Sequence, residues 1–331
     1  MSNNAAQRIV FTGKQQVELE EYPIPLPSEH EILIRTECSL MSTGTENIVF
    51  NRLFDPGTHW DEWVKYPFKP GYASVGKVIE SRILELPAGT LVTHRKGHCS
   101  HAVATVAECV KVHADVAPKD AAWFALAKIG FHGALVAEYN LGDSVLVIGA
   151  GPIGQMSVRW AKAAGAAAII VADTAAGRLE LAKSGGATLA IPEPIEKARD
   201  AILSGTGGKP PRVVIDSTGN EDVFAQALAL AADFGRVVIL GDTGRPAAQR
   251  LTNDVITRGL TVVGAHDGHN TAEWNLATIT DLFLSLVRQN RFSLAGLNTH
   301  RFLPSDCKRA YETANVERAS TMGILFDWNA G

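Results

Sequence analysis

The sequence has few cysteines and no arrangement of them that would cross-link the chain. Its 331 residues include only four, Cys38, Cys99, Cys109 and Cys307, and no two form a C-x-x-C pair. A disulfide framework or a zinc ribbon needs paired, regularly spaced thiols, so neither is indicated. We expect the four cysteines to be small buried side chains.

The chain also lacks long apolar runs and a strong charge of either sign. The formal net charge is −4 at pH 7, and charged residues, 20% of the total, interrupt every apolar run before it reaches the length of a bilayer. The first residues, M-S-N-N-A-A-Q-R, have no cationic start followed by an apolar core. We therefore expect neither nucleic acid nor a membrane as a partner, and a cytoplasmic location.

Two kinds of pattern divide this chain, whose 46% of hydrophobic residues can build a sizeable core. From Gln7 to about Pro118, short β-branched runs separated by Pro, Gly and Ser favour a small barrel or sandwich. From Ala121 onward, amphipathic helices alternate with apolar strands, which predicts a parallel sheet with right-handed crossovers. The expected strands are Val145–Ile148, Ala168–Ala172, Leu189–Ile191, Arg212–Asp216, Arg236–Leu240 and Leu260–Gly264.

The residues after His269 predict two helices and two strands. The helices are expected over Trp274–Gln289 and Ser305–Glu312, and the strands near Thr299–Phe302 and Met322–Phe326. This segment is too short for a third domain, so we expect it to return to the first one.

The most informative stretch is D-S-V-L-V-I-G-A-G-P-I-G, Asp143 to Gly154. An apolar strand is followed by G-x-G-x-x-G, in which Gly149 permits a tight turn and Gly151 lets backbone amides approach a pyrophosphate. Gly154 lets the helix predicted over Gln155–Ala164 pack closely against the strand. The stretch, including Pro152 and Ile153, therefore predicts a dinucleotide-binding site.

An acidic residue follows at the spacing that a ribose-binding carboxylate requires. Asp173 ends the next strand, where it can accept hydrogen bonds from the ribose and would repel a 2′-phosphate. The cofactor expected is therefore NAD rather than NADP. The alternative is that Asp173 caps the helix predicted over Ala175–Lys183. Arg178 could meet a phosphate, although we expect it at the adenosine side or in solvent.

The order of these segments, together with the motifs G-D-S-V-L-V-I-G-A-G-P-I-G, A-K-x-x-G-A and V-I-D-S-T-G, resembles the medium-chain dehydrogenase/reductase superfamily over essentially the whole chain. The resemblance implies an α/β fold with three parts. These are a GroES-like β-barrel domain in residues 1–124, a Rossmann doubly wound parallel sheet that binds NAD in residues 125–266, and a return to the barrel in residues 267–331. It places Gly241, Ala265 and His266 at strand ends beside the nicotinamide. It also implies a symmetric homodimer paired through the edge strand Leu260–Gly264.

The segments that hold zinc in the zinc alcohol dehydrogenases of that superfamily differ here. The G-x-C-G-T-D motif reads C-S-L-M-S-T-G-T-E, with Ser42 or Thr43 at the cysteine position, and P-G-H-E reads P-G-Y-A, with Tyr72 at the histidine position. Ala125 stands where the polyol-dehydrogenase branch has an acidic ligand. Hydroxyl and methyl side chains cannot build a tetrahedral zinc site, so we expect no metal. The motifs S-T-G-T-E and P-G-Y-x-S-V-G look closest to the branch containing bacteriochlorophyllide dehydrogenase, which oxidises a ring-borne secondary alcohol.

The function that the resemblance implies is NAD-dependent interconversion of a secondary alcohol, cyclic or bulky, and its ketone. Without zinc, hydrogen-bond donors must stabilise charge on the substrate oxygen. Thr45 aligns with the proton-relay hydroxyl of the family, and Tyr72 points at the same space. Lys128 and His132 are further candidates, although we favour structural roles for them. The alternatives are a quinone or enoyl C=C reductase and a non-catalytic NAD-binding sensor.

Aromatic residues are concentrated in the segment Phe50–Phe68, between two of the altered ligand positions. Trp60 and Trp63 could form a substrate wall for a large, flat molecule. The segment could equally be a small aromatic core beneath a lid loop.

Three histidines lie close together in T-H-R-K-G-H-C-S-H, at His94, His98 and His101, with Cys99 among them. Strand alternation would scatter their side chains over two faces, and no second ligand cluster accompanies them. We expect solvated histidines rather than a metal site.

Overall fold

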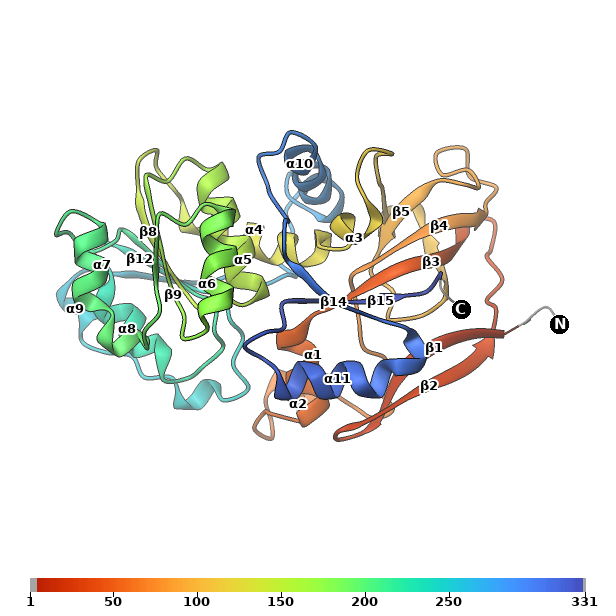
Figure 1. The fold of residues 1–331 in the computed structure, drawn as a ribbon, viewed down its shortest axis with the longest axis horizontal. Helices are drawn as coiled ribbons and strands as arrows, with labels where there is room; N and C mark the ends of the chain where they lie inside the picture. The colour runs from red at the N-terminus through yellow and green to blue at the C-terminus, as the bar shows by residue number, and fades with distance from the viewer. Residues whose placement is uncertain (1–4, 330–331) are drawn as a thin grey trace.

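The apolar strands of the middle of the chain form one parallel sheet in the computed structural model, which describes residues 5–329 (Figure 1). Its strands are β8 (Ser144–Ile148), β9 (Ala168–Ala172), β10 (Leu189–Ile191), β11 (Val213–Asp216), β12 (Arg236–Ile239) and β13 (Thr261–Gly264). They lie in the order β10-β9-β8-β11-β12-β13, so the strand order reverses between β8 and β11. Ligands bind at the carboxyl ends of the strands at such a switch point. The predicted doubly wound sheet is confirmed.

Helices cover both faces of this sheet, so its central strands β8, β9 and β11 are buried on both sides. The helices are α4 (Phe124–Ala137), α5 (Pro152–Ala163), α6 (Ala176–Gly185), α7 (Arg199–Gly205), α8 (Val223–Leu230) and α9 (Asp254–Thr257). One apolar cluster contains Val158 of α5 and Leu179 of α6, and a second contains Ile202 of α7 and Leu228 of α8. The predicted start of helix α5 is Gln155, but the helix begins earlier, at Pro152, because Pro is well suited to the first helical position.

The second lobe, referred to below as the barrel lobe, contains the first and the last of the described strands (Figure 1). Its strands are β1 (Ala5–Gly13), β2 (Gln16–Pro23), β3 (Glu31–Met41), β4 (Ser74–Glu80), β5 (Leu91–His94), β6 (His101–Thr105), β7 (Cys109–Lys111), β14 (Asn298–Phe302) and β15 (Gly323–Asp327). The order is β14-β15-β3-β4-β5-β7, with β6 also paired to β3 and a separate β1-β2 hairpin. The end of the chain returns to this lobe, since β15 pairs antiparallel with β3.

Five further helices accompany these strands: α1 (Thr43–Asn51), α2 (His59–Trp63), α3 (Pro118–Ala121), α10 (Leu276–Arg288) and α11 (Cys307–Val316). An apolar cluster joins α1 and α2 to α11, through Phe50, Trp60 and Tyr311. Helix α10 packs on α4, between the two lobes in Figure 1. The four cysteines are free and buried, as predicted.

The prediction of solvated histidines is wrong for two of the three. His94 and His98 are buried, and His101 is half-buried. His98 packs beneath Gly71 and contacts Ser39 Oγ at 2.7 Å and Glu46 Oε2 at 3.1 Å. Burial lowers the pKa of His94 to about 3, so this ring is neutral at pH 7. Both histidines are core residues whose partners come from other elements.

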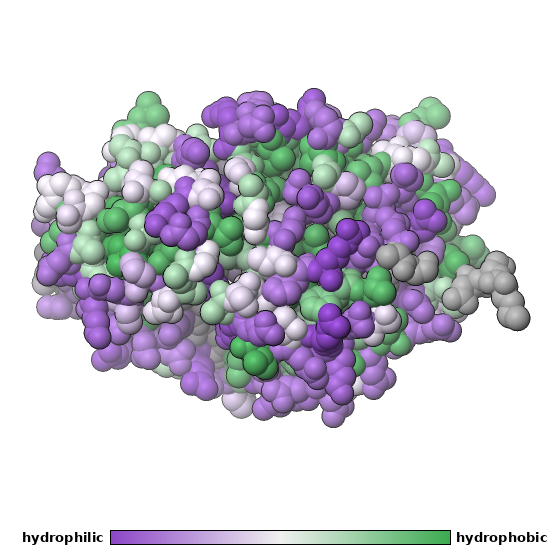
Figure 2. Space-filling view, in the orientation of Figure 1, coloured by the Kyte–Doolittle hydropathy of each residue, from purple (hydrophilic) through white to green (hydrophobic). Residues whose placement is uncertain are grey.

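On the face shown in Figure 2, hydrophilic side chains are interspersed with small groups of hydrophobic ones. Within residues 5–329, no helix is both long enough and apolar enough to cross a membrane.

Candidate active site

A cavity of about 750 Å³ lies between the two lobes and draws its walls from both. Of the residues predicted to bind cofactor or substrate, or to act in catalysis, the following line it: Thr45, Trp60, Trp63, Tyr72, Gly149, Gly151, Pro152, Ile153, Asp173, Arg178, Gly241, Ala265 and His266. Gly154 alone of the predicted set is absent from the wall and lies against Gly149 instead. The fold therefore brings residues from both halves of the sequence around one space.

The glycine turn after β8 has the geometry that only glycine allows. Gly149 has φ +89°, and a Cβ added to Gly154 would lie 1.9 Å from the carbonyl oxygen of Gly149. Helix α5 begins directly after Gly151, and no side chain caps its first amides. Free amides at the positive end of a helix dipole form a site for a phosphate group.

Asp173 is fixed beside this turn at the carboxyl end of β9. Its Oδ2 accepts a hydrogen bond from Ala150 N at 2.7 Å, and its Oδ1 accepts one from Ala175 N at 2.8 Å. The N-cap residue of α6 is Ala175, so the alternative that Asp173 is the N-cap is wrong. The carboxylate faces the cavity together with the glycine turn.

Arg178 lies in the cavity wall rather than out in solvent. Its Nη1 is 3.7 Å from the point where a Cβ on Gly151 would stand, and its Nη2 donates to the carbonyl of Arg318. Its Nε is buried and has no partner among the described residues. This cation therefore stands at the N-terminus of α5, held by the segment that precedes β15.

Three hydroxyl groups meet at the barrel side of the cavity, at two of the altered ligand positions. Tyr72 Oη donates to Ser42 Oγ at 2.5 Å, and Thr45 Oγ1 lies 3.4 Å from the same phenol oxygen. Burial raises the pKa of the Tyr72 phenol above its ordinary value, although both hydroxyls lower it. Tyr72 is therefore a neutral donor at pH 7.

A buried carboxylate holds this hydroxyl cluster in place from below. Glu46 accepts from Ser42 N at 2.8 Å, from Tyr311 Oη at 2.6 Å and pairs with His98 Nε2 at 3.1 Å. These contacts fix the start of α1, which carries Thr45. The sequence analysis missed this role of Glu46 because two of its three partners, His98 and Tyr311, are distant in the chain.

The donor set at the predicted ligand positions does not suit zinc. Ser42 and Tyr72 are hydrogen-bonded to each other, and Ala125, which has no donor atom, is fully buried. In residues 5–329, no three His, Cys, Asp or Glu side chains come together as a metal site. Zinc needs such N, S or carboxylate ligands in tetrahedral geometry.

The two tryptophans of α2 differ in burial. Trp60 is 4% exposed and belongs to an apolar cluster, whereas Trp63 is 52% exposed, with 5.8 Å between the two ring centres. The aromatic-core alternative therefore describes Trp60, and Trp63 offers an open ring to the cavity.

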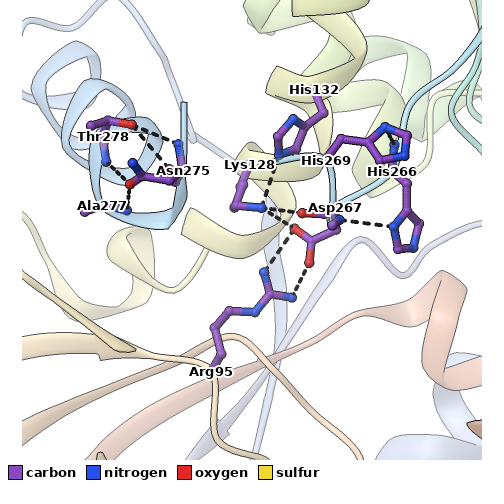
Figure 3. Close-up of polar contacts among 10 residues, drawn as sticks. Arg95, Lys128, His132, His266, Asp267, His269, Asn275, Ala277 and Thr278 are labelled. Carbon is purple, nitrogen blue, oxygen red and sulfur yellow. Dashed lines mark hydrogen bonds and ion pairs between the residues drawn. The ribbon is translucent and has the colours of Figure 1, made fainter. Parts of the chain in front are cut away.

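Lys128 and His132 do not line the cavity: Lys128 contacts Asp267, and His132 contacts Lys128 (Figure 3). Two pairs that the sequence analysis missed cross the cavity instead. Arg95 of the barrel lobe contacts Asp267, and His59 contacts Asp242 at 2.9 Å. Both aspartates follow strands of the parallel sheet, so each pair joins the two lobes.

A parallel sheet with a glycine turn at its switch point, closed over by a β-rich lobe that includes the first and the last strands, is the architecture of a two-lobed protein built on a doubly wound sheet. The family model described as "Zinc-binding dehydrogenase" matches residues 152–281. The chain is 31% identical to an L-threonine 3-dehydrogenase of Bacillus velezensis, over 89% of this chain and 91% of the relative. It is 27% identical to the sorbitol dehydrogenase of Bos taurus, over 92% of each. The chain belongs to this zinc-binding dehydrogenase family, the alcohol-dehydrogenase-like branch of the medium-chain dehydrogenases.

Solved structures share this fold with either cofactor bound. A short chain alcohol dehydrogenase of Escherichia coli CFT073 complexed with NADH superposes with a TM-score of 0.82 at 19% identity, covering 98% of this chain and 100% of that one. A Sinorhizobium meliloti 1021 protein bound to NADP gives 0.81 at 18% identity, covering 98% and 99%. These two likenesses show a shared fold, whereas the class of this chain, an alcohol-dehydrogenase-like oxidoreductase, rests on its sequence relatives.

Proposed function

We propose that this protein is a zinc-independent, NAD(H)-dependent oxidoreductase that interconverts a cyclic or bulky secondary alcohol and its ketone. The observation that carries the proposal is the cluster of three hydroxyls at the cavity wall, from Ser42 and Tyr72 at two altered ligand positions and from Thr45 at the proton-relay position. These groups can donate hydrogen bonds to a substrate oxygen without a metal. The exposed ring of Trp63 supports a substrate with a large apolar surface.

The residues around the glycine turn fit a dinucleotide. The amides at the start of α5 and the guanidinium of Arg178 would hold the pyrophosphate, and Asp173 would accept the ribose hydroxyls. Gly241, Ala265 and His266 would lie beside the nicotinamide. When bound, the nicotinamide supplies or accepts the hydride.

Side chains on the barrel side of the cavity then transfer the proton to or from the substrate oxygen. In ketone reduction, the Thr45 hydroxyl donates to the carbonyl oxygen and stabilises the charge that develops on it. Tyr72 assists, because its neutral phenol bridges Thr45 and Ser42 and can replace a proton that Thr45 gives up. In alcohol oxidation the proton leaves along the same hydroxyls to solvent water, which is also the final source of the proton in ketone reduction.

NAD is preferred over NADP in this proposal because of the charge of Asp173. The carboxylate is held at the end of β9, where a 2′-phosphate would face a fixed negative charge. Arg178 does not reverse this preference, since it stands beside Gly151, where the pyrophosphate is expected.

The protein is also proposed to form a symmetric homodimer through β13. This strand is at the edge of the six-stranded sheet, and its unpaired backbone groups can join the same strand of a second copy. Two nearby apolar side chains, Phe234 and Ile256, are largely exposed. Light scattering at micromolar concentration should give twice the mass of one chain; the mass of a single chain would contradict the dimer.

One assay tests the proposed activity against its alternatives. The absorbance of the reduced cofactor is followed with a panel of cyclic alcohols, ketones and enones. Turnover of alcohols and ketones supports the proposal. Reduction of enones alone would identify a C=C reductase, and tight NADH binding without any turnover would identify a sensor.

A further inference from the structure

The carboxylate of Asp267, in the cavity wall, contacts side chains from both lobes (Figure 3). Arg95 lies just after β5 in the barrel lobe, and its guanidinium makes two parallel contacts with Asp267, Nη1 to Oδ1 at 3.0 Å and Nη2 to Oδ2 at 2.7 Å. Such a bidentate pair fixes direction as well as distance. Asp267 follows β13 and the cavity-lining residues Ala265 and His266.

A second cation supports this carboxylate from the opposite side. The ammonium of Lys128, on α4 and only 2% exposed, donates to Asp267 Oδ1 at 3.1 Å and also to the main-chain carbonyl of Asp267. Lys128 further contacts His132 Nε2 at 3.1 Å. Burial and the charge of Lys128 lower the pKa of His132 to about 4, so the ring is neutral. The carboxylate is therefore held between two cations, and the backbone at Asp267 is held with it.

Arg95 also contacts the hydroxyl cluster. Its guanidinium carbon lies 5.1 Å from the centre of the Tyr72 ring, within the range of a cation–π contact. The other charged or titratable groups near Tyr72 are Glu46, in the first turn of α1, and His98, beneath Gly71. A single side chain thus contacts both the proposed donor tyrosine and the loop expected to face the nicotinamide.

The second pair across the cavity provides a matched comparison. His59 and Asp242 have side chains 57% and 40% exposed, against 27% and 24% for Arg95 and Asp267. Ion pairs between exposed, flexible side chains are screened by water, so they constrain the relative position of the two lobes only weakly. The Arg95 pair is bidentate, more buried and backed by Lys128, so it is the contact that can hold the lobes in register.

We propose that Arg95 is a positioning residue, which acts through Asp267 and the Tyr72 ring to hold the loop after β13 and the hydroxyl cluster in the relative placement that turnover needs. The catalytic part of this proposal, the effect of Arg95 on turnover, rests on the proposed function. The structural part, the placement of the loop and the hydroxyl cluster, does not. Neutral Arg95→Gln leaves one cation, Lys128, for Asp267, so no unpaired buried charge results.

The structural part is tested by hydrogen exchange on the unliganded protein. Arg95→Gln should speed amide exchange in two segments far apart in sequence, around residues 95–98 and 265–269, while Arg95→Lys changes them less. His59→Asn should leave both segments unchanged. Equal exchange in wild type and Arg95→Gln would overturn the proposal, whether or not a substrate is known.

The catalytic part is tested with the substrate that the assay panel identifies. Arg95→Gln should lower kcat by about 10²-fold, the cost expected from a misplacement of about 1 Å, with NADH affinity and KM nearly unchanged. His59→Asn should lower kcat by about fivefold or less. A kcat of Arg95→Gln within about twofold of wild type would contradict the positioning role. If the wild type shows no turnover, the proposed function is contradicted. The hydrogen-exchange result then tests the structural role of Arg95 alone.

Discussion

The two sides of the cavity are built by different means. The parallel-sheet side is mainly backbone, formed by a turn at Gly149 with φ +89°, the close approach of Gly154 and the uncapped start of α5. The barrel side is made of side chains, in which Tyr72, Ser42 and Thr45 meet above Glu46. The same backbone site can serve many dehydrogenases, whereas we propose that the side-chain cluster determines the chemistry of this one.

The largest effect is expected on the barrel side, from Thr45→Val. The change keeps the shape and removes the hydroxyl, so turnover should fall by about 10²–10³-fold, the loss of roughly 2.7–4 kcal/mol expected for one oxyanion-type donor. NADH affinity should be unchanged, because Thr45 lies on the other side of the cavity. Steady-state kinetics and NADH titration of the same preparation measure both quantities.

Tyr72→Phe is the companion variant, expected to reduce turnover less than Thr45→Val does. If Tyr72→Phe abolishes turnover and Thr45→Val leaves it near normal, the tyrosine is the proton donor and the two roles are exchanged. Near-normal turnover in both variants would show that the donor lies elsewhere.

The next largest effect is expected on the backbone side, from Gly154→Ala. The added Cβ would stand 1.9 Å from the Gly149 carbonyl oxygen, so the turn must move. We expect a loss of about 1–3 kcal/mol in the free energy of unfolding and weak NADH binding. Gly177→Ala is the matched control, because no atom lies within 4 Å of its added Cβ in α6. Because Gly177 is the second residue of α6, this change should alter the free energy of unfolding by about 0.5 kcal/mol or less. Denaturant unfolding compares the free energies of unfolding of Gly154→Ala and Gly177→Ala. Equal values would disprove the tight packing of Gly154 against Gly149.

The sequence anticipates the backbone side much better than the barrel side. All six parallel strands end within one residue of their predicted bounds, because each is an apolar run bounded by turn residues. The glycine spacing likewise follows from local geometry alone. Local patterns carry this information, since a strand or turn is decided by neighbouring residues.

The barrel side depends on contacts between residues that are far apart in the chain, and local sequence patterns do not predict such contacts. Arg95 and Asp267 are 172 residues apart, and their contact exists only once the lobes meet. His98 looked like a solvated histidine, but Glu46 and Ser39 from other elements bury it. Substitutions at the zinc positions were visible in the sequence; the hydrogen bond between two of the substitutes, Ser42 and Tyr72, was not.

A smaller effect is expected from Asp173→Ala, the one charged side chain on which the NAD preference rests. NADH affinity should fall by about tenfold or more, since a hydrogen bond to a charged group contributes about 1.5–3 kcal/mol. NADPH affinity should fall less, which narrows the gap between the cofactors. Asp173→Asn keeps an acceptor for Ala150 N and serves as the structural control. Fluorescence titration with NADH and NADPH measures both affinities. Tighter binding of NADPH than of NADH by the wild type would refute the preference for NAD.

The most direct test of the account is the metal content of the active protein. Elemental analysis of the purified chain, with turnover measured on the same sample before and after a strong chelator, should show no stoichiometric zinc and unchanged activity. That result is expected because Ser42 and Tyr72 are bonded to each other and Ala125 has no donor atom. About one tightly held zinc per chain, with activity lost to the chelator, would contradict a hydroxyl-based site.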